Sequence, residues 1–243
     1  MIFQAQKGQV YYGHKIGILM LDTFIPLIPG DVGNATTYDY PVLYRTLHKI
    51  TAHKMVNKAP GVLEEIISKG KELVDNGAEA ITGGCGFLLL YQDELRKALN
   101  VPVFLSSLLQ IPFMLLMLNT NEKVGLITAD SSLLKASLLR EIGIAEIDRV
   151  EIVGLEKTEH FRECCMNESG TLNSDVLEAE VVTTAEKMVH TNPNIKSILL
   201  ECSLLPPYAK AVQEAVHLPV FDYVTMINYV QASLNKTNFS GFL

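Results

Sequence analysis

The chain contains an internal repeat, and this repeat restricts the possible fold more than any other feature of the sequence. Residues 15–22 (KIGILMLD) match residues 123–130 (KVGLITAD), with a glycine and a terminal aspartate in register. Residues 81–104 align without a gap on residues 198–221, and both copies end on Pro-Val-Phe. Self-similarity of this kind indicates that one supersecondary unit is used twice. We therefore expect two similar halves.

Each half alternates short apolar runs with longer segments of helical periodicity. The apolar runs have the length of buried parallel strands; they are residues 15–21, 78–84, 123–129 and 196–201. Between them, GVLEEIISKGKELVDNG and VLEAEVVTTAEKMVHTNPN repeat apolar residues with the period of a helix. This alternation predicts an α/β fold with two Rossmann-like parallel sheets, each covered by helices. We expect lobe one to comprise residues 15–116 completed by 222–235, and lobe two residues 117–221.

Composition and charge exclude several classes of protein. The net charge is −7 and no cluster of Lys and Arg is present, which argues against a nucleic-acid partner. The apolar run 101–118 contains two prolines and several polar residues, so we expect no membrane span. Without a secretory leader at the N-terminus, we expect a cytoplasmic protein. Its four cysteines should be free thiols, and their spacing does not match a zinc site. No metal and no cofactor are expected.

The repeat places Cys85 in register with Cys202, at the carboxyl end of a predicted strand in each half. Ligands of open parallel sheets bind at these strand ends. If a pseudo-two-fold axis relates the halves, the two thiols approach one ligand from opposite sides of a cleft. One thiolate can then remove a proton from carbon while the other thiol delivers one to the opposite face. We therefore predict Cys85 and Cys202 as a catalytic acid/base pair.

Residues around the strand ends are candidates for substrate binding. Glycines beside Cys85 leave the backbone accessible to an anion, and Ser203 adds a hydroxyl beside Cys202. Other polar residues follow the first strand of each half or lie in the PGDVGN loop, where they could equally cap local turns. Glu201 could be a buried acid, but strand alternation points it away from Cys202. The full set of substrate-binding candidates is Asp22, Thr23, Asn34, Gly84, Gly86, Phe87, Thr128, Ser131 and Ser203.

These features resemble the aspartate/glutamate racemase superfamily over roughly residues 15–234. The resemblance rests on the strand–Cys–helix unit in each half, the IPGDVGNATT loop and the ECSLLPPYA stretch. It implies two flavodoxin-like lobes, a cleft between them and cofactor-independent chemistry beside a carboxylate. Typical members have Asn-Thr after the first cysteine and Thr-His after the second, whereas this chain has Gly86-Phe87 and Ser203-Leu204. These departures predict a more apolar pocket.

The sequence therefore predicts a racemase or isomerase that acts at the carbon next to a carboxylate, on an amino acid or a related small acid. Relatives in the superfamily keep two alternatives open: an arylmalonate-type decarboxylase, or a maleate-type cis–trans isomerase, each using one cysteine. A third alternative is a non-catalytic carboxylate-binding protein. The expected partner is a small carboxylate, with no nucleic acid and no membrane. A homodimer is the expected oligomer.

Overall fold

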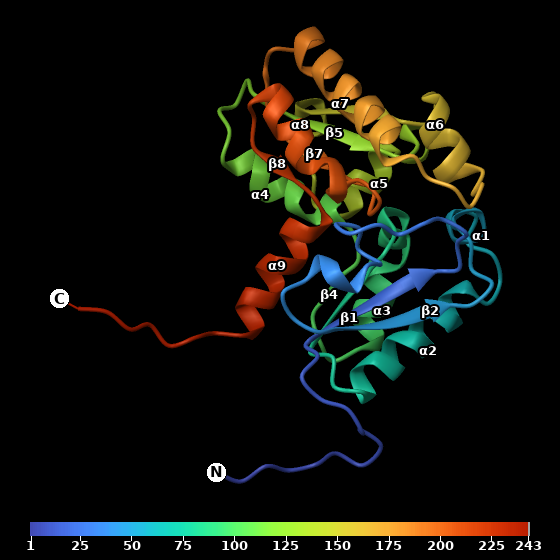
Figure 1. Ribbon diagram of the computed structural model, residues 1–243, viewed down its shortest axis with the longest axis vertical. Coiled ribbons are helices and arrows are strands. Elements are labelled where there is room, and N and C mark those ends of the chain that lie inside the picture. The colour runs from blue at the N-terminus through green and yellow to red at the C-terminus, as the bar shows by residue number, and fades with distance from the viewer. Residues whose placement is uncertain (243) are drawn as a thin grey trace.

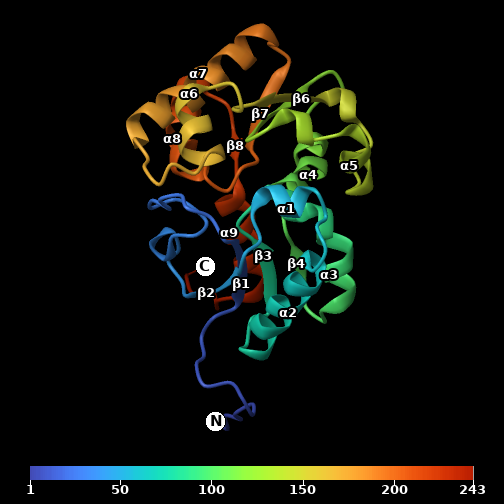
Figure 2. The same cartoon turned by 90° about the vertical axis from the view of Figure 1, so that its right-hand side faces the viewer.

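The fold consists of two lobes, each built on a four-stranded parallel sheet, as the computed structural model of residues 1–242 shows (Figure 1). The first sheet has the order β2-β1-β3-β4, and the second has the order β6-β5-β7-β8. The two sheets lie in separate lobes, one above the other (Figure 2). The strands of the first sheet are β1 (Ile16–Leu21), β2 (Val42–Leu47), β3 (Ala80–Gly83) and β4 (Val103–Phe104). Those of the second are β5 (Lys123–Thr128), β6 (Val150–Gly154), β7 (Ile195–Leu200) and β8 (Val220–Phe221).

Helices cover both sheets, so the predicted fold class is confirmed. In chain order they are α1 (Ala52–Val56), α2 (Val62–Asp75), α3 (Gln92–Ala98), α4 (Ile111–Leu116), α5 (Ala136–Glu141), α6 (Glu159–Phe161), α7 (Ser174–Thr191), α8 (Ala209–Val216) and α9 (Tyr223–Leu234). The apolar runs and the two helical segments of the sequence correspond to β1, β3, β5 and β7 and to α2 and α7. The edge strands β2 and β6 were not predicted.

The duplication is visible in matched backbone contacts of the two sheets. Gly17 pairs with Ile81 between β1 and β3, and Gly125 pairs with Ile198 between β5 and β7. A side chain at Gly17 would lie 2.7 Å from Cδ1 of Ile81, and one at Gly125 would lie 2.9 Å from Cδ1 of Ile198. Each lobe therefore needs a glycine at the same place, because a helix and a neighbouring isoleucine cover the strand there.

The last backbone hydrogen bond of each pair of central strands is also repeated. Gly84 N–H donates to Leu19 O at 2.8 Å, and Glu201 N–H donates to Ile127 O at 2.8 Å. Both bonds lie one residue before a predicted catalytic cysteine. The two cysteines consequently leave their sheets from equivalent positions.

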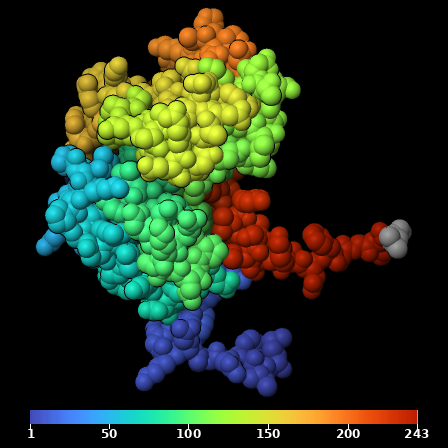
Figure 3. Space-filling model, turned by 180° about the vertical axis from the view of Figure 1, so that it is seen from behind, coloured from blue at the N-terminus to red at the C-terminus, as the bar shows by residue number. Residues whose placement is uncertain are grey.

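The core continues from one lobe into the other. One cluster of buried side chains includes Leu19 of β1, Ile111 of α4 and Leu126 of β5. The space-filling view shows the lobes packed directly on each other, with both ends of the chain extending from the body (Figure 3). Since apolar burial is the main stabilising contribution to folding, the cleft between the lobes rests on a shared core.

Helix α9 packs against the first sheet, although it follows the last strand of the second. Its residues Tyr223, Met226 and Ile227 form a buried cluster with Ile16 and Ile18 of β1. The Tyr223 hydroxyl also donates to Leu105 O at 2.8 Å. The placement of α9 agrees in outline with the expected lobe arrangement, whereas the boundaries 15–116, 222–235 and 117–221 stay a prediction.

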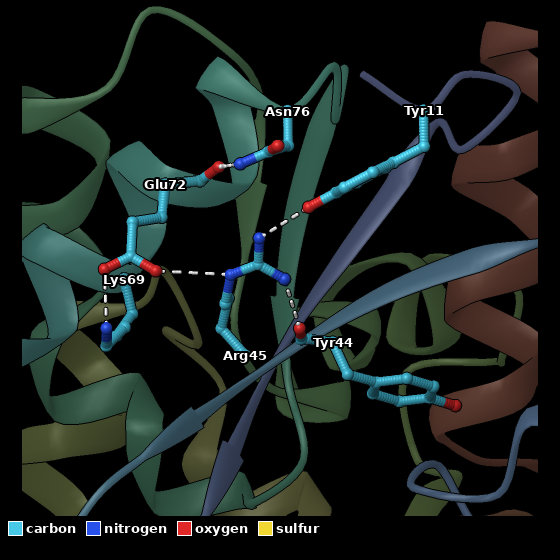
Figure 4. Close-up of polar contacts among 6 residues, drawn as sticks. All are labelled: Tyr11, Tyr44, Arg45, Lys69, Glu72 and Asn76. Carbon is cyan, nitrogen blue, oxygen red and sulfur yellow. Dashed lines mark hydrogen bonds and ion pairs between the residues drawn. The ribbon is translucent and has the colours of Figure 1, made fainter. Parts of the chain in front are cut away.

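A polar network at the edge of the first sheet holds the N-terminal segment (Figure 4). Arg45 of β2 contacts the Glu72 carboxylate of α2 at 3.2 Å and donates to the Tyr11 hydroxyl at 2.8 Å. Lys69 hydrogen-bonds the same carboxylate and, together with Arg45, holds the pKa of Glu72 below its usual value. The network is partly exposed, so its contribution to stability is small.

Within residues 1–242, no helix is both long and apolar enough to cross a membrane.

We expect Gly17→Val and Gly125→Val each to lower the free energy of unfolding by about 1–3 kcal/mol, because a branched side chain overpacks the strand–helix contact. Urea denaturation measures the change. Gly241→Val is the matched control, since no atom lies within 4 Å of the added carbon, and it should leave stability unchanged. A loss of stability in only one of the two variants would contradict the structural equivalence of these glycines.

Candidate functional site

A cavity of about 650 Å³ lies between the lobes, at the carboxyl ends of the central strands. Both predicted catalytic cysteines line it: Cys85 follows β3, and Cys202 follows β7. The lining is completed by Met20, Leu21, Thr23, Ile25, Leu27, Asp31, Thr51, Ala52, His53, Val56, Asn57, Gly84, Phe87, Ala129, Asp130, Leu133, Phe161, Cys165, Met166, Asn167, Glu168, Ser203 and Leu204. The cavity is therefore mainly apolar, with a few polar groups between apolar walls.

Cys85 stands at the start of a 3₁₀ helix, Gly86–Tyr91, whose first turn is closed by a hydrogen bond from Leu88 N–H to Cys85 O. Burial raises the pKa of the Cys85 thiol to about 12, and Glu201 adds to the increase. The nearby N–H groups of Phe87 and Leu88 act on the pKa in the opposite direction. A thiol with this pKa is protonated near neutral pH.

Cys202 has a similar environment in the second lobe. Burial raises the pKa of its thiol well above the usual value, and the negative charges of Glu201, Cys85 and Asp31 raise it further. The N–H group of Leu204 lowers it. The two cysteines line the same cavity from the two lobes. Ionisation of either thiol needs an added positive charge or a stronger set of hydrogen bonds.

Two hydrogen bonds join the lobes around the cavity. The Ser203 hydroxyl donates to Gly84 O at 2.7 Å, which links the residue after Cys202 to the residue before Cys85. Farther out, Phe24 N–H donates to the Glu168 carboxylate at 2.9 Å. The first bond fixes the spacing of the two cysteine loops, and the second connects loops of opposite lobes at the cavity lining.

Glu201 lies buried directly behind the two cysteines. Its Oε2 accepts a hydrogen bond from the Thr128 hydroxyl at 2.7 Å, whereas Oε1 is buried without a partner in the described residues. Burial raises the pKa of this carboxyl to about 7. Glu201 is buried, as the sequence allowed, and it does not line the cavity. A carbon added at Gly86 would overlap Oε1, so Gly86 gives the carboxyl its space.

The charges around the cavity are acidic. Of residues 1–242, no lysine or arginine lines the cavity, whereas Asp31, Asp130 and Glu168 do. Asp31 is 2% exposed, and burial raises the pKa of its carboxyl to about 7. An anionic ligand would therefore have to be held by backbone N–H groups and by neutral side chains such as those of Thr23, Thr51 and Asn57. A ligand that also carries a positive charge would find a complementary carboxylate.

The structure brings only part of the predicted substrate set to the cavity. Thr23, Gly84, Phe87 and Ser203 line it together with the two cysteines. The others are engaged elsewhere. The Asp22 carboxylate accepts a hydrogen bond from Lys49 N–H at 2.8 Å, and the Asn34 side chain caps the 3₁₀ turn at Ala35–Thr37.

Three further predicted residues also lie outside the lining. Thr128 is buried and donates to Glu201, and Gly86 lies against the same carboxyl. The Ser131 hydroxyl donates to the Glu156 carboxylate at 2.8 Å. Thr128 and Gly86 therefore stand behind the cavity, where they hold Glu201 in place. Ser131 has no contact with the cavity in the described residues.

Several lining residues were missed by sequence reasoning. Asp31 belongs to the same PGDVGN loop as Asn34, and nothing in the sequence distinguished the two. Cys165 was not among the predicted site residues, yet it lines the cavity on the helical turn after α6, and its sulfur lies 3.2 Å from that of Cys164. His53 also lines the cavity from its exposed rim. A loop residue's direction depends on long-range packing, so none of these carried a local signal.

The described residues, 1–242, contain no cluster of three or more His, Cys, Asp or Glu arranged to hold a metal ion.

Comparison with curated proteins reveals clear relatives, although no family model matches the chain. Dimethylsulfoniopropionate lyase 3 of Emiliania huxleyi is 33% identical over 228 residues, which cover 90% of this chain and 60% of the relative. Dimethylsulfoniopropionate lyase 7 of the same organism is 32% identical over 231 residues, or 90% of this chain and 67% of the relative. A dimethylsulfoniopropionate lyase of Durusdinium sp. clade D is 28% identical over 224 residues, which cover 88% of this chain and 73% of the relative. The chain thus spans about 60% of the length of the first relative.

Comparison with solved structures confirms the fold resemblance to the aspartate/glutamate racemase superfamily. A mutant arylmalonate decarboxylase superposes with a TM-score of 0.60 at 17% identity, covering 92% of this chain and 94% of the other. An aspartate racemase homologue from Pyrococcus horikoshii superposes with a TM-score of 0.56 at 21% identity, covering 91% of this chain and 99% of the other. Allantoin racemase from Pseudomonas fluorescens gives 0.57 at 15% identity, with 90% of each chain covered. At these identities the likeness concerns the fold alone.

The buried Glu201 makes a testable contribution to pH-dependent stability. Its folded-state pKa of about 7 lies above the usual 4.5, so the folded state binds the proton more tightly than the unfolded state. This stabilisation is complete below pH 4.5 and is lost as the pH rises through about 7. Relative to wild type, Glu201→Gln should gain free energy of unfolding over this range, by at most about 1.4 kcal/mol per pH unit. Urea midpoints measured across the range test this, and a stability difference independent of pH would contradict it.

Proposed function

The chain belongs to the family of the dimethylsulfoniopropionate lyases, and on that premise we propose that it is a lyase acting on dimethylsulfoniopropionate or a closely related zwitterion. In this substrate a dimethylsulfonium group is bonded to the carbon two positions from the carboxylate carbon. The bond between sulfur and that carbon breaks once a proton leaves the carbon next to the carboxylate. The observation that carries the proposal is the cavity itself: two thiols face a space that has a buried acid and neither lysine nor arginine in its lining.

We assign the base to Cys202. Its thiolate removes a proton from the carbon next to the carboxylate, and the electron pair forms a carbon–carbon double bond. The carbon–sulfur bond then breaks, and dimethyl sulfide leaves with the bonding pair as a neutral thioether. Acrylate remains, and the Cys202 proton returns to solvent. Because the leaving group needs no proton, elimination requires one base, whereas racemisation requires a base and an acid.

The charge of the substrate supports the choice of Cys202. Burial raises the pKa of this thiol, and Asp31, which lines the same cavity, adds to the increase. A sulfonium group bound beside Asp31 would bring a positive charge close to Cys202 and lower the pKa of the thiol. The substrate would thereby favour formation of its own base. The carboxylate end would face N–H groups such as those of Phe87 and Leu88 beside Cys85.

The duplicated cysteines favour a second candidate, the racemase or isomerase predicted from the sequence. Cys85 and Cys202 occupy equivalent positions, as a two-base mechanism needs, and the fold is shared with racemases and with arylmalonate decarboxylase. The acidic lining is the argument against a simple dicarboxylate, which would meet Asp31 with no lysine or arginine in the lining formed by residues 1–242. We therefore place elimination first.

Replacing the two cysteines separates these mechanisms. We expect Cys202→Ser to lower kcat for release of dimethyl sulfide by about 10²-fold or more, because a serine hydroxyl is a far weaker acid than a thiol. Cys85→Ser should retain measurable turnover. Headspace gas chromatography of dimethyl sulfide is the readout. Cys164→Ser, which removes a buried thiol outside the cavity lining, should keep wild-type activity.

The opposite pattern would point elsewhere. Equal and complete loss in both variants would indicate that the two thiols act together, as in racemisation. Undiminished cleavage in Cys202→Ser would remove Cys202 from the mechanism.

A further inference from the structure

Asp31 is a buried carboxyl that faces the cavity and has only one hydrogen-bonding partner of its own. Its Oδ1 accepts from Gly33 N–H at 2.7 Å, and no donor to Oδ2 is present within the described residues. The backbone around it is held firmly: Asp31 N–H donates to Ile28 O, and the Thr37 hydroxyl donates to Asp31 O at 2.7 Å. The loop therefore presents this carboxyl to the cavity in a fixed position.

No neighbouring side chain neutralises this carboxyl. Asp31 takes part in no ion pair within residues 1–242, and the cavity lining lacks lysine and arginine over the same range. The hydroxyls of Tyr38 and Tyr44, which lie close by, donate to Val32 O instead. An ionised carboxylate that is buried without a counter-charge destabilises the folded state. A cationic ligand would remove this penalty.

The walls around Asp31 suit a cation that cannot donate hydrogen bonds. Phe87, Met20 and Leu27 line the same cavity, and Phe161 lies fully buried in its wall, so the wall is aromatic and apolar. Methyl groups on a sulfonium or quaternary ammonium centre are apolar, while the centre keeps its charge and interacts favourably with aromatic faces. An ordinary ammonium group would leave N–H donors unmatched against such walls.

We propose that Asp31 is a specificity-determining residue of this site, which selects small carboxylates bearing a methylated onium group over neutral carboxylates of the same shape. This inference rests on the proposed function and identifies the residue that recognises the cationic group of its substrate. Asp31 supplies the counter-charge, and the aromatic and apolar residues enclose the methyl groups.

Two compounds of equal shape test the proposal by binding alone. 3-(Trimethylammonio)propionate and 4,4-dimethylpentanoate differ only in a charged nitrogen against a neutral carbon. Isothermal titration calorimetry is performed one pH unit above the Asp31 pKa of about 7, where the carboxyl is ionised. Wild type should bind the ammonium compound about tenfold or more tightly than its isostere. Asp31→Asn should bind the two compounds equally, since asparagine keeps the Oδ1 acceptor for Gly33 and loses only the charge.

Asp222→Asn is the matched control. Asp222 is also a buried acid with a raised pKa, but it caps α9 and does not line the cavity. This variant should keep the preference for the ammonium compound even if its melting temperature changes. Thermal unfolding of Asp31→Asn shows whether that variant is folded. If it is not, competition between the two compounds for wild type still tests the preference.

The possible outcomes distinguish this inference from the proposed function. Absence of a preference in wild type, no binding of the ammonium compound, or a preference that persists in folded Asp31→Asn would each overturn the inference. A preference that depends on Asp31, with no cleavage of dimethylsulfoniopropionate, would support the inference and overturn the proposed function. Cleavage of dimethylsulfoniopropionate without any preference for the ammonium compound would support the proposed function and overturn the inference.

Discussion

The geometry of the site depends on the last backbone hydrogen bond between the central strands of each sheet. Gly84 N–H to Leu19 O and Glu201 N–H to Ile127 O end the two sheets at equivalent points. One residue later, in each lobe, the backbone turns away from the sheet, and a cysteine lies at the strand end. The Ser203 hydroxyl then bonds to Gly84 O, and this contact ties the two turns to each other. The separation of the thiols is thus set by the backbones of both sheets, which are among the most rigid parts of a fold.

The second constraint is the placement of charge in an apolar cavity. Asp31 and Glu201 are both almost completely buried, and neither has a basic partner in the described residues. Their positions differ: Asp31 faces the cavity, whereas Glu201 lies behind the cysteines with Thr128 and Gly86. Buried acids of this kind reduce stability near neutral pH, and such costs are common at functional sites. In our proposal the cost at Asp31 is offset when a cationic substrate binds.

Much of this organisation was predictable from the sequence, because the repeat carries it. The strands β1, β3, β5 and β7 lie where the apolar runs predict them, and both cysteines reach one cavity. The edge strands β2 and β6 were missed, since their mixed polar and apolar residues give no continuous apolar run.

The polar residues of the site were predicted less well, for physical reasons. Asn34 and Asp31 occupy one loop, and only the packing of the lobes determines that Asp31 turns toward the cavity. The surroundings of Glu201 depend on Thr128 and Gly86, which are far from it along the chain, so the sequence around Glu201 did not predict them. The sequence likewise did not predict the charge of the ligand. That charge is inferred from which acids are buried at the cavity, and their spacing along the chain does not reveal this.

The most direct test of the central claim is proton NMR of dimethylsulfoniopropionate incubated with the protein in D₂O. Our account predicts vinyl signals of acrylate together with the methyl signal of dimethyl sulfide, formed in equal amounts. Exchange of the protons beside the carboxylate without any vinyl signal would show carbanion formation without elimination. That result would contradict a lyase and return the chain to the racemase mechanism that its two cysteines also permit.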